Sequence, residues 1–378
     1  MAKNILITGG AGFIGSTLAL SLVASGHKVR VLDSLAPQIH GADPSKSPLF
    51  RSIQGAVEFH HGNVTNKEDL KKVLPDIDTV VHLAAETGTG QSMYAIRHYA
   101  DVNIGGTTLL LDLIANEPFP VSKIVVASSR AVYGEGKYRC AIHGAVFPNP
   151  RSDANMSKGD FSVHCPACGA VTELMASDED TPVRPSSVYG ITKLTQEQMT
   201  LTVGRALGIS AVALRYQNVY GPGQSLLNPY TGILSIFSTR IRNGNGINVF
   251  EDGKESRDFV FIDDVVTATT AAIDFEPRTS EVFNVGSGVA TDVLTIATML
   301  QELLGVKVPT NISGQYRVGD IRHNVADLTR IRATLGFEPT VSLEQGLGRF
   351  VSWVKGEQVH VCRYEDSLRE LMAKGLFK

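Results

Sequence analysis

A glycine-rich turn near the N-terminus constrains the fold more than any other feature of the sequence. Residues 3–8 form a short apolar run. Gly9, Gly12 and Gly15 follow it with the spacing GxxGxxG, and apolar residues then recur over 16–25. Glycines at such a turn let backbone N–H groups approach a pyrophosphate, whose charge is favoured at the N-terminus of the following helix. The pattern predicts a strand, a phosphate-binding turn and a helix; the alternative is an ordinary tight turn.

Asp33 follows a second apolar run, residues 27–32, where the next strand of such a fold would end. A carboxylate at this position can accept hydrogen bonds from the ribose hydroxyls of an adenosine. The arrangement therefore favours NAD over NADP as the cofactor, and a solvated loop carboxylate is the alternative. The next segment, 34–55, is polar and contains proline and glycine, which predicts a loop.

The composition argues against several classes of partner. With 378 residues the chain can form a large α/β core or two lobes. A net charge of −3 without a long basic run argues against a nucleic-acid partner. The sequence shows neither a secretory signal nor an apolar run of membrane-spanning length, so we expect a cytoplasmic protein without a membrane partner. In a reducing compartment the four cysteines are expected to be free thiols or metal ligands.

Strand-like and helix-like segments alternate along the first part of the chain. Helical patterns cover 94–115 and 189–207, and further strand-like runs cover 57–60, 79–85, 123–127 and 210–215. This alternation predicts an α/β protein with a Rossmann-like, doubly wound parallel sheet. We expect an NAD-binding domain over residues 1–222, with an insertion at about 135–182. Residues 223–378 are expected to form mostly a smaller substrate-binding lobe, with some segments returning to the core.

Tyr189 and Lys193 form a Tyr-x-x-x-Lys pair, which places both side chains on one face of the predicted helix. A free phenol has a pKa of about 10, but a neighbouring ammonium and a positive nicotinamide ring would favour the phenolate. A phenolate can take a proton from a sugar hydroxyl as hydride leaves the same carbon, and Ser129 at a strand end could hydrogen-bond the same oxygen. The alternatives are a solvated helix face and an ordinary strand-end hydroxyl.

Seven segments occur in the order typical of one enzyme family: 8–15, 82–85, 128–134, 189–193, 214–222, 253–259 and 283–286. Together they resemble the NAD-dependent nucleotide-sugar epimerase/dehydratase family of the extended short-chain dehydrogenases/reductases. The resemblance implies a tightly held NAD and a nucleoside-diphosphate sugar as the substrate. It also implies a catalytic set of Ser129, Tyr189 and Lys193, and a homodimer formed through the helices at 94–115 and 189–207.

The resemblance also implies which residues bind ligands. Arg257, Arg322 and Asn218 are expected to contact the substrate's sugar diphosphate, because arginine forks suit phosphate oxygens; surface ion pairs are the alternative for the arginines. Ser129 and Tyr189 are expected to contact the sugar. The expected cofactor contacts are Gly9, Gly12, Phe13, Ile14, Gly15, Asp33, Asn63, Val64, Leu83, Ala84, Ala85, Asn103, Tyr189 and Lys193.

The two residues after Ser129 bear on the reaction type. In the family's 4,6-dehydratases these positions carry carboxylates, which act as the further acid and base of water elimination. Its sugar-acid decarboxylases tend to carry a glutamate there. This chain has Arg130 and Ala131 instead, which favours a 4-epimerase over both alternatives. A regulatory protein that binds NAD without turnover is the non-enzymatic alternative, which an intact Ser129, Tyr189 and Lys193 set disfavours.

Two further segments bear on the substrate. Residues 86–94 and 317–324 most resemble those of bacterial family members that epimerise dTDP-L-rhamnose. This similarity implies interconversion of dTDP-L-rhamnose and dTDP-6-deoxy-L-talose, so a dTDP-sugar is the favoured substrate.

An insertion interrupts the family pattern. Tyr133 and Tyr189 are 56 positions apart, which is longer than the gap typical of the family. The inserted segment holds a C-x2-H pair and a C-x2-C pair, a spacing that suits tetrahedral zinc. We expect a structural Zn²⁺ that orders a zinc-knuckle insertion; chance thiols in a flexible loop are the alternative. The expected ligands are Cys140, His143, Cys165 and Cys168, with His164 as an alternative to His143.

Overall fold

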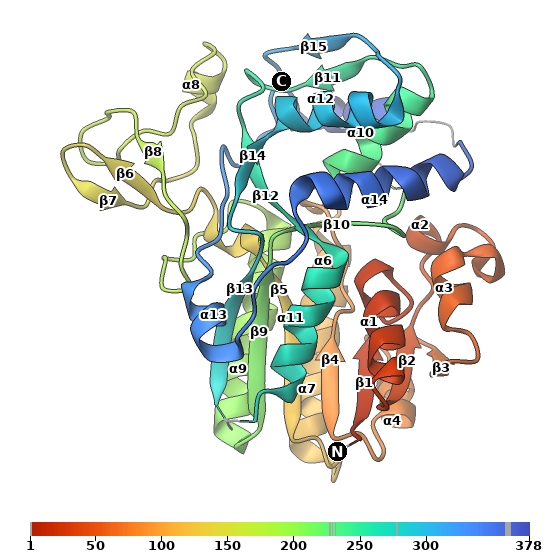
Figure 1. The fold of residues 1–378 in the computed structure, drawn as a ribbon. Helices are drawn as coiled ribbons and strands as arrows, with labels where there is room; N and C mark the ends of the chain where they lie inside the picture. The colour runs from red at the N-terminus through yellow and green to blue at the C-terminus, as the bar shows by residue number, and fades with distance from the viewer. Residues whose placement is uncertain (1, 227, 229, 231, 277–278, 360–363) are drawn as a thin grey trace.

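One parallel sheet forms the centre of the protein (Figure 1). The computed structural model describes residues 2–226, 228, 230, 232–276, 279–359 and 364–378. Within these residues seven strands pair side by side, and every pairing is parallel. In spatial order the strands are β3 (Glu58–His61), β2 (Lys28–Asp33), β1 (Asn4–Thr8), β4 (Thr79–His82), β5 (Lys123–Ser129), β9 (Ser210–Tyr216) and β13 (Ser280–Val285).

Helices cover both faces of this sheet, which explains why its central strands are continuous apolar runs. Alternate residues of β1 serve opposite faces: Ile5 and Ile7 belong to one buried cluster and Leu6 to another. The first face packs against α1 (Phe13–Ala24) and α11 (Ile262–Asp274), and the second against α4 (Lys67–Val73), α7 (Gly106–Asn116) and α9 (Val188–Leu207). The doubly wound α/β fold expected from the sequence is therefore confirmed. Strand order reverses between β1 and β4, which places the ligand crevice of such a sheet at the carboxyl ends of these strands.

The segment 34–55 contains short helices where the sequence predicts a loop. Each helix has a proline at its first position, where no intrahelical N–H bond is needed. The Ser47 Oγ also caps one of them by accepting a hydrogen bond from the Phe50 N–H at 3.5 Å. The prolines were therefore helix starts rather than loop residues. The helices are α2 (Pro37–His40), η1 (Pro44–Lys46) and α3 (Pro48–Ile53).

The helix predicted over 94–115 is interrupted. A short turn, α6 (Ile96–Tyr99), runs into a π-helical segment, η2 (Ala100–Gly105), before α7 begins. The π-helical turn places Asn103 in the interior, where its side chain is fully buried. Such turns are rare and frequent at functional sites, and here the turn borders the carboxyl end of β4.

A smaller lobe lies over the carboxyl ends of the sheet (Figure 1). The lobe draws residues from both sides of position 222, and β13 returns from it to the main sheet. Its helices are α10 (Ile233–Arg242), α12 (Val293–Leu304), α14 (Leu343–Gly356) and α15 (Tyr364–Ala373). Its strands are β10 (Asn218–Tyr220), β12 (Ser256–Phe261) and β14 (Ala290–Asp292) in one small sheet, and β11 (Ile247–Val249) and β15 (Thr310–Ile312) in another.

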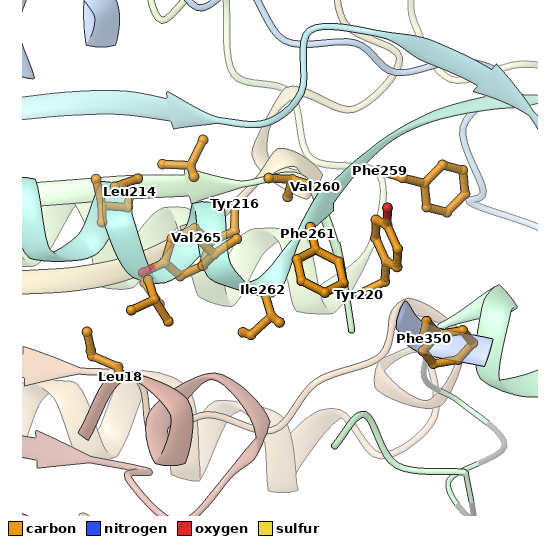
Figure 2. Packing of buried hydrophobic residues seen from close by; sticks show 14 of the residues in the cluster. Leu18, Leu214, Tyr216, Tyr220, Phe259, Val260, Phe261, Ile262, Val265 and Phe350 are labelled. Atoms are coloured by element: carbon orange, nitrogen blue, oxygen red, sulfur yellow. The ribbon is translucent and has the colours of Figure 1, made fainter. Parts of the chain in front are cut away.

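The hydrophobic core continues from the main sheet into this lobe (Figure 2). Leu18 of α1 and Leu214 of β9 belong to the same buried cluster as Phe350 of α14. Tyr220 and Phe261 join the two regions, and their rings pack edge to face with centroids 5.4 Å apart. A shared core of this kind fixes the lobe over the edge of the sheet.

The insertion between β5 and α9 projects to one side of the body, beside the lobe (Figure 1). Its three strands pair antiparallel in the order β7-β6-β8. They are β6 (Tyr138–Cys140), β7 (Gly144–Val146) and β8 (Glu173–Leu174), and the insertion also carries α8 (Asp153–Met156). Among the described helices of the whole chain, none combines the length and the apolar character that crossing a bilayer requires.

Candidate active site

The turn between β1 and α1 presents backbone N–H groups at the carboxyl edge of the sheet. Gly12 is the N-cap of α1 and no side chain caps this helix, so the amides of Phe13, Ile14 and Gly15 can face an anion. A Cβ on Gly15 would lie 2.4 Å from the Gly9 carbonyl oxygen, and Gly9 itself has a φ of 70°. Glycine is therefore required at both positions. This cradle fits the pyrophosphate of a dinucleotide.

Asp33 holds this turn from the end of β2. Its buried carboxylate accepts hydrogen bonds from the Ala11 N–H at 2.9 Å and from the Leu35 N–H at 2.8 Å. The sequence predicts a ribose contact for Asp33. Holding the turn is an additional role for Asp33. The local sequence does not reveal it, because Ala11 and Asp33 become neighbours only in the folded sheet.

Residues after β3 and β4 line the same edge. Val64 is buried beneath Gly106, at which a Cβ would lie 2.6 Å from Val64 Cγ2. Asn63 is exposed, and its Oδ1 accepts a hydrogen bond from the Thr65 N–H at 3.0 Å. The half-buried residues after β4 lie against the glycine turn, where a Cβ on Gly9 would lie 2.8 Å from the Ala84 nitrogen. These residues are Leu83, Ala84 and Ala85.

Asn103 was expected to contact the cofactor, but the structure engages its amide with protein groups. Its Oδ1 accepts a hydrogen bond from the Glu86 N–H at 2.7 Å, and its Nδ2 donates to the Glu86 carbonyl at 3.1 Å and to Thr192 Oγ1 at 2.9 Å. Asn103 thus ties the segment after β4 to α9. These contacts support a positioning role for the side chain.

Ser129, Tyr189 and Lys193 converge where β5 ends and α9 begins. Ser129 is the last residue of β5, and its side chain hydrogen-bonds the Tyr189 side chain. Ser129 Oγ also accepts a hydrogen bond from the Ala131 N–H at 3.1 Å. Lys193 lies one turn after Tyr189 on α9, and its ammonium donates to the Ala127 carbonyl of β5 at 2.9 Å. The structure therefore brings Ser129 and Tyr189 together and places Lys193, from the same helix as Tyr189, against the end of β5.

Two serines fix the orientation of Tyr189. Ser187 is the N-cap of α9, and its Oγ accepts a hydrogen bond from the Gly190 N–H at 3.1 Å. Ser92 Oγ accepts a hydrogen bond from the Tyr189 N–H at 3.0 Å. The first turn of the helix is thus held from both its own cap and the segment after β4.

Burial dominates the ionisation of Tyr189 and Lys193. Burial raises the pKa of Tyr189, and the hydrogen bond with Ser129 and the charge of Arg130 oppose this effect only in part. Burial lowers the pKa of Lys193 to about 7. The sequence predicts that Lys193 lowers the pKa of Tyr189. In the structure the cation that does so is Arg130.

Arg130 begins a short 3₁₀ turn, η3 (Arg130–Tyr133), directly after Ser129. Burial, and the charge of Arg257, lower the pKa of Arg130 to about 10, so its guanidinium stays positive at neutral pH. Burial alone would raise the pKa of the nearby Asp320. The charges of Arg317, Arg257 and Arg130 instead lower the Asp320 pKa to about 2. Arg130 therefore places a positive charge beside Tyr189, at the position where a dehydratase would carry an acid.

Arg257 and Asn218 lie on the paired strands β12 and β10. The Arg257 guanidinium donates to the carbonyls of Ile321 at 2.9 Å and Arg322 at 3.0 Å, and to Asp320 Oδ1 at 3.2 Å. Asn218 Oδ1 is buried and has no hydrogen-bond partner among the described residues. An unpartnered buried amide oxygen suits a ligand that donates a hydrogen bond.

Arg322 is expected to contact the substrate's diphosphate. In the structure its guanidinium is paired with carboxylates of the protein. Its Nη1 donates to Glu251 Oε2 at 2.7 Å, and its Nη2 donates to Asp252 Oδ2 at 2.8 Å. Its backbone N–H donates to Glu135 Oε2 at 2.9 Å. The buried guanidinium is therefore satisfied within the protein, because acids from two distant segments surround it.

Arg151, from the insertion, joins this network and was not predicted from the sequence. Its Nε donates to Glu135 Oε1 at 3.0 Å, its Nη1 to Glu251 Oε2 at 2.8 Å and its Nη2 to the Asp320 carbonyl at 3.0 Å. The side chain is only 3% exposed. The partners lie far from one another in sequence, so no spacing pattern could have signalled them.

The four expected metal ligands come together in the insertion. The Cys140 Sγ lies 3.6 Å from His143 Nδ1 and 3.7 Å from Cys168 Sγ, and the Cys165 Sγ lies 3.6 Å from His143 Nδ1. All four ligand atoms lie within 4.8 Å of one another. Cys362, the remaining cysteine, lies outside the described residues.

Comparison with known proteins shows the family of the chain. The NAD dependent epimerase/dehydratase family matches residues 5–158 and 162–286. A dTDP-L-rhamnose 4-epimerase of Burkholderia thailandensis is 40% identical over 357 residues, which cover 94% of this chain and 96% of that protein.

Solved structures of two epimerases superpose on the chain. The UDP-glucose 4-epimerase of Thermotoga maritima, with UDP-glucose, has a TM-score of 0.74 at 30% identity and covers 93% of this chain and 99% of its own. The UDP-glucuronic acid 4-epimerase of Bacillus cereus, in complex with UDP-glucuronic acid and NAD, has a TM-score of 0.75 at 28% identity, with 93% and 99% covered. The family match spans the glycine turn and the converging Ser129, Tyr189 and Lys193. The chain therefore belongs to the NAD dependent epimerase/dehydratase family.

Proposed function

We propose that this NAD-dependent nucleotide-sugar epimerase interconverts dTDP-L-rhamnose and dTDP-6-deoxy-L-talose by inverting C4. The contact of Ser129 with Tyr189 at the carboxyl end of β5, with Lys193 held against the same strand, is the observation that carries the reaction type. The dTDP-sugar is supported by the relative in Burkholderia thailandensis, and by the sequence of residues 86–94 and 317–324.

Tyr189 is the acid–base group of the proposed reaction. Its phenolate takes the proton of the C4 hydroxyl, and Ser129 hydrogen-bonds the same oxygen. Because burial raises the pKa of Tyr189, nearby positive charge must favour the phenolate, and Arg130 supplies such a charge. Bound NAD would supply the hydride acceptor and donor at C4, and the 4-keto sugar would turn over in the site before hydride returned to its opposite face. Tyr189 then gives the proton back to the C4 oxygen.

The cofactor is proposed to lie along the carboxyl ends of the strands. The N-terminal turn of α1 would hold the pyrophosphate, and Asp33 would reach the adenosine ribose from the turn that it anchors. Lys193 would contact the nicotinamide ribose from α9. The segments after β3 and β4, including Asn63 and Val64, complete the wall on the adenine side.

Arg130 and Ala131 support epimerisation over elimination. A 4,6-dehydratase needs a further acid and base beside the sugar, and neither a guanidinium nor a methyl group can exchange protons at neutral pH. The positive charge of Arg130 instead favours an anionic oxygen at Tyr189. For an oxidised sugar in this site, Tyr189 can return the proton and bound NAD would return the hydride. The two positions after Ser129 offer no carboxylate to catalyse loss of water.

Arg257 and Asn218 are the proposed contacts with the sugar diphosphate. Most of the bonds of Arg257 go to neutral carbonyls, so its positive charge is offset mainly by Asp320. Arg322 is proposed as the second arginine. Its partner Asp252 is 40% exposed and can yield to a phosphate oxygen, while Glu251 keeps the guanidinium in place.

The proposal extends to the organisation of the molecule. Residues 1–222 form the NAD-binding domain, with the insertion at about 135–182, and residues 223–378 form mostly the substrate lobe. Two copies pair through the regions 94–115 and 189–207, where Ile96 and Ile191 are exposed apolar side chains. Zn²⁺ is the proposed second cofactor, with a structural role in the insertion.

A substrate panel followed by proton NMR tests the proposed activity. We expect dTDP-L-rhamnose to convert fastest, with a change in the H4 coupling that reports inversion at C4 and no build-up of a keto sugar. UDP-glucose and UDP-glucuronic acid are the competing substrates, and preferred turnover of either would overturn the dTDP assignment. A 4-keto-6-deoxy product from dTDP-glucose would instead identify a dehydratase.

A further inference from the structure

The insertion has very little hydrophobic core of its own. Its buried apolar cluster consists of Tyr138, Cys140, Val146, Val163 and Cys165, with Leu174 packed against it. Two of these side chains are thiols, and the supporting strands β6, β7 and β8 are short. A segment with so small a core usually needs a disulfide or a metal to hold a single conformation.

The four candidate ligand atoms already have the spacing of a tetrahedral zinc site. Bond lengths of about 2.3 Å to sulfur and about 2.0 Å to nitrogen place two sulfurs about 3.8 Å apart, and a sulfur and a nitrogen about 3.5 Å apart. The observed separations are 3.7 Å between Cys140 Sγ and Cys168 Sγ, and 3.6 Å from His143 Nδ1 to the sulfurs of Cys140 and Cys165. These three separations therefore match edges of a tetrahedron around one ion, and all four ligand atoms lie within 4.8 Å of one another.

The two ligand pairs lie on turns that share one spacing. In each pair two residues separate the ligands, and a glycine with positive φ follows the second ligand: Gly144 at 69° and Gly169 at 72°. In the first turn the Ile142 N–H points at Cys140 Sγ, 3.4 Å away. In the second the Gly169 N–H closes the turn onto the Cys165 carbonyl at 2.8 Å.

Two competing arrangements are disfavoured by the geometry. A disulfide needs sulfurs about 2.05 Å apart, whereas the sulfurs of Cys140 and Cys168 are 3.7 Å apart and all three cysteines of the insertion are free. His164 cannot replace His143, because its Nε2 pairs with Asp160 at 2.8 Å and its Nδ1 faces the Gly169 carbonyl at 2.9 Å. Three thiolates and one imidazole exclude hard cations such as Mg²⁺ and Ca²⁺, and they form a common structural zinc set.

The insertion also reaches the proposed substrate site through Arg151. Arg151 Nη1 and Arg322 Nη1 both donate to the same oxygen, Glu251 Oε2, at 2.8 and 2.7 Å. Arg151 and Arg322 also share Glu135, one through its Oε1 and the other through its Oε2. The position of Arg322 therefore depends on acids that Arg151 holds in place.

We propose that Cys140, His143, Cys165 and Cys168 bind one structural Zn²⁺, and that the metal-ordered insertion positions Arg322 through Arg151. The metal part stands on the ligand geometry alone. The positioning part rests on the proposed function, because it assigns Arg322 to the substrate diphosphate. Arg151 acts through Glu135 and Glu251 and is a positioning residue, not a catalytic one.

Metal analysis of the purified chain tests the zinc site without any substrate. We expect about one zinc per chain by elemental analysis. Co²⁺ replacement should give the intense visible bands of tetrahedral thiolate coordination. C165S and H143A should lose the metal, whereas H164A and C362S, as matched controls, should keep it. Wild-type protein that takes up neither Zn²⁺ nor Co²⁺ under reducing conditions, or an H164A variant that loses the metal, would overturn the assignment.

Binding of dTDP and UDP to R151A, measured by calorimetry, tests the coupling. We expect R151A to keep its zinc and its NAD but to bind the nucleoside diphosphate at least tenfold more weakly, with KM affected more than kcat. R139A is the control, because Arg139 lies on the same insertion but pairs with Glu173 on the exposed surface at 2.7 Å. Unchanged affinity in R151A would overturn the positioning role and leave the metal site standing. Wild-type protein that binds neither nucleotide would instead contradict the proposed function.

Discussion

The surroundings of Tyr189 disfavour ionisation of its phenol. Burial raises its pKa, and the two groups that counter this effect, Ser129 and Arg130, are neighbours at the end of β5. Lys193, which the Tyr-x-x-x-Lys spacing suggested for this task, is directed instead to the Ala127 carbonyl. The sequence could identify the residues of the set from their spacing. It could not show which cation acts on the phenol, because that depends on how two elements pack.

Replacing Tyr189 by phenylalanine should remove the acid–base group without disturbing the fold. We expect kcat to fall about 1000-fold, within the range typical of general acid–base catalysis. The melting temperature and the bound NAD should stay near wild-type values, because Ser187 and Ser92 bond the backbone and not the phenol. Steady-state turnover with dTDP-L-rhamnose measures the effect. A Y189F variant that keeps more than about a tenth of its activity would mean that another group carries the proton.

Glu255 should make stability depend on pH. The residue is buried, and its Oε2 has no hydrogen-bond partner in the described part of the chain. Burial, with help from Glu251, raises its pKa from 4.5 to about 7. Between these values the folded protein holds a proton that the unfolded chain releases, so this group lowers the free energy of unfolding as pH rises through that window.

The E255Q variant removes this titration. We expect the difference in free energy of unfolding, E255Q minus wild type, to increase from pH 5 to pH 8 by up to about 3 kcal/mol. Urea denaturation at several pH values measures the difference. E302Q is the control, because Glu302 is exposed on α12 and should leave the pH profile unchanged. A constant difference between E255Q and wild type across this range would rule out the buried, protonated Glu255.

At the scale of elements, six of the seven strands of the main sheet and the helix α9 followed from local pattern, whereas β13 and the irregular elements did not. The expected strand-like runs coincide with β1, β2, β3, β4, β5 and β9, and α9 begins within a residue of its expected start. The helix over 94–115 was expected to be continuous, yet a π-helical turn interrupts it around Asn103. That turn serves Glu86 and Thr192, which are distant in sequence, so periodicity alone could not reveal it.

The cap of α9 should matter for activity as well as stability. Ser187 Oγ accepts the Gly190 N–H, and Tyr189 lies between the two. We expect S187A to cost about 1 kcal/mol of stability and also to lower kcat, because the first turn carries Tyr189. S342A is the matched control: it removes the N-cap of α14, far from Tyr189 in the chain, and should cost similar stability with unchanged kcat. Equal losses of kcat in both variants would show that the cap does not position Tyr189.

At the scale of the whole molecule, three regions meet at the proposed substrate site. The main sheet supplies Ser129, the lobe supplies Arg257, and the insertion supplies Arg151. The sequence predicted the sheet and the four-residue Cys/His set, because both depend on spacing within short segments. It could not predict the shared acids Glu135 and Glu251, which Arg151 joins across the insertion and the lobe.

Isotope tracing tests the proposed hydride-transfer reaction most directly. Purified protein would be incubated with dTDP-L-rhamnose in D₂O, without added NAD, and the product examined by proton NMR. If tightly bound NAD takes hydride from C4 and returns it, dTDP-6-deoxy-L-talose should form with its original hydrogen still at C4. Deuterium at C4 would mean that a proton, and not a hydride, leaves this carbon. Either that result or a failure to convert dTDP-L-rhamnose would contradict the proposed reaction.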